Sequence, residues 1–169
     1  MAAYVDYDYY LQIYGNNISD TDFARIAREA SRKVDIATTG IDNIKKLKTA
    51  FPTDEDDAEA VKMCICKIIN VMWQINQAEI RVNYARDVIK ENDGSVHGRF
   101  VTSKTAGNES ISYSTGTSEG STSIDKVMTD KSMQENLYKE IIREYLSGIT
   151  DCNGVNLLYA GRYPNINKG

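Results

Sequence analysis

The feature that most constrains the fold is an unbroken apolar repeat between residues 61 and 89. Its nine members follow one another at alternating spacings of three and four: Val61, Cys64, Ile68, Val71, Ile75, Ala78, Val82, Ala85 and Ile89. Such spacing places side chains on one side of an α-helix and is typical of coiled-coil-like packing. We therefore predict one long central helix from Asp54 to Asn92, about 58 Å long at about 1.5 Å per residue. A small domain covers such a helix only in part, so we expect another copy of the chain to pack against the remainder.

Two shorter helices are predicted before the apolar repeat. Ser19 is a good N-cap for a helix whose apolar face runs through residues 23–37. Another helix is expected over 41–50. Pro52 prevents it from continuing, because proline disfavours the helical state in the residue before it. The second helix carries a basic cluster, which we interpret as a solvent-exposed face in preference to a phosphate site: Lys45, Lys46 and Lys48.

Alternating apolar and polar residues after the repeat predict a small β-hairpin. Segments 99–104 and 109–114 alternate in this way and are joined by a short turn that contains glycine. An isolated hairpin is marginally stable in water, so this one packs either on the helices or on strands of neighbouring copies. Ser132 and Glu135 then form a capping box for a helix over 130–147, an antiparallel partner for the long helix.

Together these patterns predict a mainly α fold: a helical bundle with one long central helix, a small inserted β-hairpin and extended termini. The predicted organisation is a tyrosine-rich arm over 1–18, a helical domain over 19–150 with the hairpin insertion at 97–115, and a C-terminal docking tail over 151–169. The arm either lies on its own domain or contacts a neighbouring subunit, because tyrosine is favoured at interfaces. The apolar patch in the tail docks either on its own domain or on a partner protein.

The composition argues against catalysis and metal binding. His97 is the single histidine, so neither a Ser-His-Asp nor a Cys-His constellation can form without it. Cys64, Cys66 and Cys152 are too few for a disulfide framework, and a zinc site needs about four ligands. We interpret Cys64 and Cys66 as small buried hydrophobic residues. We therefore predict that the protein is not an enzyme, with no catalytic residue, no cofactor and no metal.

Charge and hydropathy also exclude two classes of partner. Lys and Arg total 20 while Asp and Glu total 24, so the formal charge is 20 − 24 = −4. A net acidic chain lacks the basic surplus typical of nucleic-acid-binding proteins. No segment approaches the roughly 18 apolar residues of a membrane span, and the N-terminus has no signal-peptide pattern. We expect neither specific nucleic-acid binding nor membrane insertion.

Several short patterns occur in a characteristic order. They are the tyrosine-rich start leading to Tyr14-Gly15-Asn16 and Ile18, then Phe23 and an alanine-rich helix ending in Val34-Asp35 with Thr38, the long helix, Ser-Ile-Ser-Tyr-Ser at 110–114, and Leu157-Leu158-Tyr159-Ala160-Gly161. In this order the chain resembles the head-tail adaptor proteins (head-completion or connector proteins) of long-tailed bacteriophages. One departure is Gly40, where the family pattern favours an arginine before Ile41.

The resemblance implies a structural virion protein, made in the host cytoplasm and located at the neck between head and tail. It implies a homo-oligomeric ring, a dodecamer, with the portal protein on one side and the next connector (stopper) or a tail protein on the other. DNA would pass through the central hole during genome ejection without specific binding, and an acidic lumen would repel its phosphates. The alternative is a helical protein-protein interaction or scaffold module with no catalytic activity.

By the same analogy, the protein interface lies in the hairpin and the tail. It comprises Phe100, Val101, Ile111, Tyr113, Val155, Leu157, Leu158 and Tyr159. On this view, deleting the chain after Gly154 leaves the helical fold intact and abolishes docking to the portal.

Overall fold

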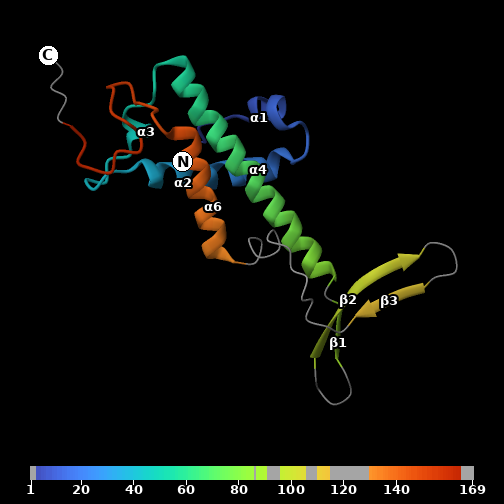
Figure 1. Cartoon of the computed structure of the whole chain (residues 1–169). Coiled ribbons are helices and arrows are strands. Elements are labelled where there is room, and N and C mark those ends of the chain that lie inside the picture. Colours follow the sequence, from blue (N-terminus) through green and yellow to red (C-terminus); the bar gives the residue numbers. More distant parts are fainter. Residues whose placement is uncertain (1–2, 86, 91–95, 106–109, 115–129, 165–169) are drawn as a thin grey trace. The chain divides into compact units, whose positions relative to one another are not determined.

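The computed structural model describes residues 3–85, 87–90, 96–105, 110–114 and 130–164. The chain divides into two compact units, one formed by Met1–Trp73 with Ser132–Gly169 and the other by Gln74–Lys131. The described residues are mainly helical, which confirms the mainly α part of the predicted fold (Figure 1). None of the described helices is both long enough and apolar enough to cross a membrane.

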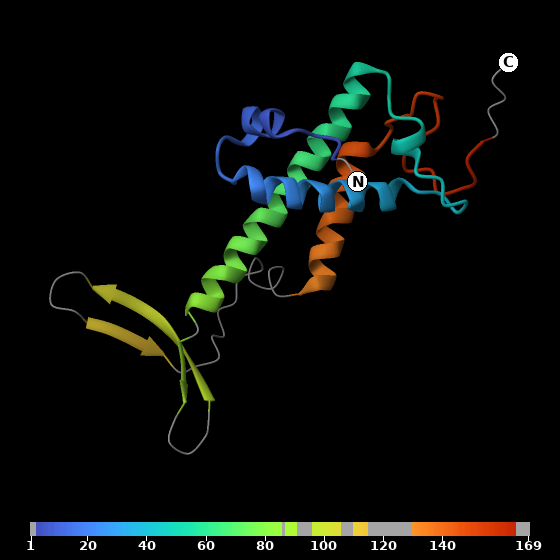
Figure 2. The same ribbon diagram turned by 180° about the vertical axis from the view of Figure 1, so that it is seen from behind.

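The first unit is built from helices. They are α1 (Tyr7–Tyr14), α2 (Asp20–Thr38), α3 (Lys46–Thr49), the N-terminal part of α4 (Glu55–Ala85) and α6 (Lys131–Leu146). Within this unit α1 and α6 lie on opposite sides of the N-terminal half of α4, in Figure 1 and from behind in Figure 2. Ser19 caps α2 as predicted, since its side chain accepts a hydrogen bond from the Asp22 N–H.

The core of the first unit surrounds the N-terminal half of α4. Six residues of this helix are completely buried: Val61, Cys64, Ile65, Cys66, Ile68 and Ile69. The apolar face of α2 is buried with them through Phe23, Ile26, Ala27, Ala30 and Val34. Cys64 and Cys66 are buried, as predicted, and are free thiols. Burial on nearly every side of α4 explains how two cysteines two residues apart are both enclosed.

The predicted end of the long helix is wrong. α4 ends at Ala85, whereas the apolar repeat had placed the helix end at Asn92. Ile89, the last member of that repeat, lies in β1 (Asp87–Lys90) and faces His97 in the antiparallel pairing of β1 with β2 (Val96–Thr105). Val88 and Ile89 are β-branched and fit a strand better than a helix, and pairing with β2 gives their backbone an alternative set of hydrogen bonds.

The second unit contains a three-stranded antiparallel sheet in the order β1-β2-β3, where β3 is Ser110–Ser114. Val101 faces Tyr113 across β2 and β3, and the register shifts between Val101 and Ser103. The predicted insertion at 97–115 therefore begins inside β2, and β1 was not predicted at all. Residues 106–109 and 115 of that insertion lie outside the described residues.

The helix predicted over 41–50 is also wrong in extent, because only α3 is helical there. A turn precedes it, in which the Asn43 N–H donates to the Gly40 carbonyl and Asn43 has a φ of 60°. Asparagine tolerates this left-handed conformation better than most residues. Lys46, predicted to face solvent with its neighbours, is completely buried. Its ammonium group donates hydrogen bonds to three backbone carbonyl oxygens.

The tyrosine-rich arm lies on its own domain. α1 was not predicted as a helix, yet Asp6 caps it by accepting the Tyr9 N–H. The Tyr4 hydroxyl donates to Asp35 Oδ1 at 2.6 Å, and the Tyr4 ring stacks on Phe51. Further ring contacts join Tyr7 and Tyr10 to Phe23. Of the two alternatives for the arm, the structure shows packing on its own domain.

We predict that alkali destabilises the folded protein. Burial raises the pKa of Tyr4, Tyr9 and Tyr10 from 10.0 and that of Tyr14 to about 12, and it raises the pKa of Cys64 and Cys66 from 9.0 to about 12. A raised pKa means that the folded state keeps a proton that the unfolded state loses. The stabilisation is therefore complete below pH 9 and decreases as the pH rises toward 12.

The melting temperature measured from pH 7 to pH 12 should stay level to about pH 9 and then fall steeply. Lys46 acts in the opposite direction, because burial lowers its pKa from 10.5, but the groups with raised pKa values outnumber it. A melting temperature that remains constant up to pH 11 would contradict the prediction.

Candidate functional site

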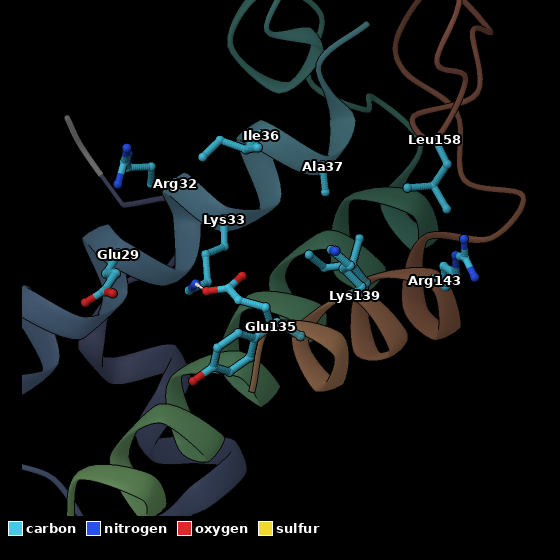
Figure 3. Close-up of a pocket in the computed structure, with 11 residues that line it drawn as sticks. Glu29, Arg32, Lys33, Ile36, Ala37, Glu135, Lys139, Arg143 and Leu158 are labelled. Atoms are coloured by element: carbon cyan, nitrogen blue, oxygen red, sulfur yellow. Dashed lines mark hydrogen bonds and ion pairs between the residues drawn. The ribbon is translucent and has the colours of Figure 1, made fainter. Parts of the chain in front are cut away.

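A groove of about 550 Å³ lies between α2 and α6 (Figure 3). Helix α2 lines it with Glu29, Arg32, Lys33, Ile36 and Ala37. Helix α6 lines it with Glu135, Tyr138, Lys139, Ile142 and Arg143. Both sets follow the same i, i+3, i+4, i+7, i+8 spacing, so each is a single stripe along one face of its helix. Leu158, from the C-terminal segment, completes the lining.

The floor of the groove is apolar. Tyr138 and Ile142 of α6 are buried, and Leu158 is half-buried. Ile36 of α2 is 61% exposed, although isoleucine is a large apolar residue. An exposed apolar side chain in a concave surface gains free energy when a partner covers it.

The charges around this floor are mostly positive. The Lys33 ammonium forms an ion pair with Glu135 and lies 4.6 Å from the centroid of the Tyr138 ring. Arg32, Lys139 and Arg143 are exposed and form no ion pair with any residue that the structure describes. With Glu29, the lining has four basic and two acidic side chains, a formal charge of 4 − 2 = +2 in a chain of net charge −4. The groove thus combines apolar surface with positive charge that no described residue neutralises.

Lys46 of α3 holds the C-terminal segment that supplies Leu158. Its ammonium donates to the carbonyl oxygens of Asn156 at 3.3 Å and of Leu157 at 2.9 Å, and also to that of Tyr159. Three ammonium hydrogens thus meet three acceptors, the full donor capacity of a lysine. Burial lowers the pKa of Lys46, while the negative charges of Asp151 and Asp42 act against this shift.

Two carboxylates fix the rest of the segment. The buried Asp151 accepts the backbone N–H groups of Asn153 and Val155, each at 2.9 Å, and the hydroxyl of Tyr163. Asp42 accepts the Tyr163 N–H at 2.6 Å, and this hydrogen bond is the main reason that the pKa of Asp42 is lowered. The C-terminal segment is therefore fastened to the turn between α2 and α3.

The start of α4 is also hydrogen-bonded to the chain just after α6. The Asp57 carboxylate accepts both the N–H and the hydroxyl of Thr150, each at 3.0 Å. Asp57 belongs to the acidic first turn of α4, so one member of that turn has a structural role beyond favourable interaction with the helix dipole.

Gly40 allows the backbone of the C-terminal segment to approach the turn between α2 and α3 closely. The Ile41 N–H donates to the Ala160 carbonyl at 3.2 Å, and a Cβ added at Gly40 would lie 2.5 Å from the Gly161 carbonyl oxygen. A side chain at position 40 would push the C-terminal segment away. The arginine that the family pattern favours before Ile41 therefore does not fit this arrangement.

The predicted interface residues fall into two groups that belong to different units. Phe100 and Val101 lie in β2, and Ile111 and Tyr113 lie in β3. The other four belong to the C-terminal segment of the first unit, where Val155 and Leu158 are half-buried, Tyr159 is 49% exposed and Leu157 is completely buried.

Leu157 is therefore a core residue of its own chain, and its predicted place on an exposed interface is corrected. The expectation that deletion after Gly154 spares the fold is also corrected. Such a deletion removes Leu157 and all three carbonyl acceptors of Lys46, leaving a buried ammonium without partners.

Sequence reasoning missed the groove and the role of Lys46. The groove had a detectable signal, because Glu29 with Lys33 and Glu135 with Lys139 are acid-base pairs at i, i+4 on two predicted helices. Lys46 had none, since its partners are backbone carbonyls more than a hundred residues away.

Among the described residues, no group of three or more His, Cys, Asp or Glu side chains is arranged to hold a metal ion. The chain matches no family model, no curated protein and no solved structure with which it was compared.

Proposed function

We propose that this chain is a structural protein of a tailed-phage virion, a head-tail adaptor that forms an oligomeric ring between the portal and the next connector or tail component. In this role it performs no chemistry. It is a helical bundle with one long central helix, a β insertion and terminal segments that contact other proteins. DNA passes through the ring without specific recognition.

The observation that carries a protein-binding role is the groove between α2 and α6. A concave surface with Ile36 exposed and three cations that no described residue pairs has the features of a site that binds a protein segment, with apolar contact in the centre and charge at the rim. The order of sequence patterns, from the tyrosine-rich start to Leu157-Leu158-Tyr159, supports the more specific role in the phage neck.

The C-terminal segment takes part through the residues that remain accessible. Lys46, Asp42 and Asp151 hold this segment in place, so Leu158 and Tyr159 are presented on a fixed backbone. A preformed surface loses less conformational entropy on binding than a flexible tail. We propose that these two residues contact the portal, together with the side chains of β2 and β3 that the resemblance implicates.

A second candidate is a helical interaction or scaffold module outside the virion. The groove favours it to the same extent, because an apolar floor with a basic rim suits any acidic partner segment.

Binding to the portal tests the proposal. The full chain is mixed with the assembled portal protein encoded in the same genome, and the complex is separated by size and imaged by electron microscopy. We expect a ring of this chain coaxial with the portal, and the same protein in purified virions. Absence from purified virions, together with no portal binding at the highest soluble concentration, would overturn the adaptor role.

A further inference from the structure

The basic groove has a counterpart of opposite charge in the same unit. Five exposed carboxylates lie at the start of α1 and in the first two turns of α4, and we call them the acidic face: Asp6, Asp8, Glu55, Asp56 and Glu59. The two helices are joined there because the Tyr9 hydroxyl donates to Glu59, and the Lys62 ammonium lies 5.5 Å from the centroid of the Tyr9 ring. None of the five carboxylates forms an ion pair with another described residue.

The acidic face and the groove draw on helices that lie on opposite sides of α4. Helix α1 lies on one side of the N-terminal half of α4, and α6 lies on the other side (Figures 1 and 2). A single copy therefore cannot satisfy its own groove with its own acidic face. Two copies can do so if they are arranged head to tail.

We infer that the groove between α2 and α6 receives the acidic face of a second copy of this chain. Arg32, Lys139 and Arg143 then meet the carboxylates of the neighbour, and the exposed side chain of Ile36 becomes covered. The inference rests on the proposed function and names the contact by which the ring forms. A contact between two different surfaces of the same protein is heterologous, and it closes into a ring when the rotation between copies divides a full turn.

Charge reversal on each surface tests the inference. The groove variant carries Lys139→Glu and Arg143→Glu, and the face variant carries Asp8→Lys and Asp56→Lys; all four side chains are exposed. Self-association of the full chain is measured by sedimentation velocity over a range of concentrations at low salt. We expect each variant to raise the dissociation constant by about 100-fold, because like charges facing each other across an interface suppress association.

Mixing the two variants provides the decisive measurement. In an equimolar mixture, the acidic groove of one variant meets the basic face of the other, so we expect association to return to nearly the wild-type level. The matched control reverses two exposed cations that do not line the groove, Arg28→Glu with Lys45→Glu, and should associate like the wild type. Circular dichroism melting curves show whether each variant is folded.

The outcomes separate this inference from the adaptor role. A wild-type chain that binds the portal but stays monomeric alone, or a mixture that fails to associate, overturns the inference and leaves the adaptor role standing. A groove variant that loses portal binding with unchanged self-association assigns the groove to another protein and also overturns the inference. A chain that self-associates through the groove but ignores the portal overturns the adaptor role alone.

Discussion

Replacing Lys46 with methionine is expected to lower the free energy of unfolding by about 3 kcal/mol, since hydrogen bonds to charged groups contribute about 1.5–3 kcal/mol and buried acceptors left without partners add to the loss. Methionine fills similar volume, so the effect isolates the three hydrogen bonds to the carbonyls of Asn156, Leu157 and Tyr159. Urea denaturation of the full chain measures the change.

The same substitution should release the C-terminal segment locally. The Leu157 N–H, which donates to the Ile149 carbonyl at 2.9 Å, is expected to exchange with solvent faster in the variant. The matched control is Lys45→Met, because Lys45 is the exposed neighbour and its ammonium makes no hydrogen bond with a described residue. Equal losses in the two variants would show that the buried ammonium does not fasten the segment.

Replacing Ile68 with aspartate is expected to unfold the first unit, with a loss of more than about 4 kcal/mol. Ile68 is completely buried on α4 among Ile65 and Ile69, so the substitution removes apolar packing and buries a carboxylate without a partner. Loss of the helical circular dichroism signal at room temperature, or a melting temperature far below that of the wild type, would confirm the prediction.

The matched control makes the same change on the same helix. Ile80 is 38% exposed, so Ile80→Asp should lower stability by less than about 1 kcal/mol, as is usual for surface substitutions. Equal melting temperatures for the two variants would contradict the burial of Ile68 that the structure shows.

Helical periodicity predicted burial well within single helices, where it depends on residues a few positions apart. The apolar spacing on α2 and the N-terminal half of α4 correctly identified buried residues, except that Ala37, at the end of the predicted face of α2, is exposed. Ser19 was correctly identified as a cap. The same spacing misled beyond Ala85, because Ile89 matches a helical repeat and is also a good strand residue. Pairing with β2 decides between the two, and this pairing is not visible in a periodic pattern.

Side-chain environment was less predictable than secondary structure. Lys46 and Lys45 look alike in the sequence, yet one is buried and the other is exposed. Leu157 and Tyr159 belong to one apolar patch, yet the first is a core residue and the second lies at the surface. In each case the difference depends on which distant segment packs against the backbone.

The sequence by itself determined the mainly helical class, the net acidity and the presence of a single histidine, because these depend on composition and on neighbours a few positions apart. Only the tertiary structure decided that Lys46 fastens the C-terminal segment, that Gly40 must lack a side chain, and that α2 and α6 form a basic groove. Those features arise from contacts between residues far apart in the chain, and their free energies depend on burial and distance, which no local pattern encodes.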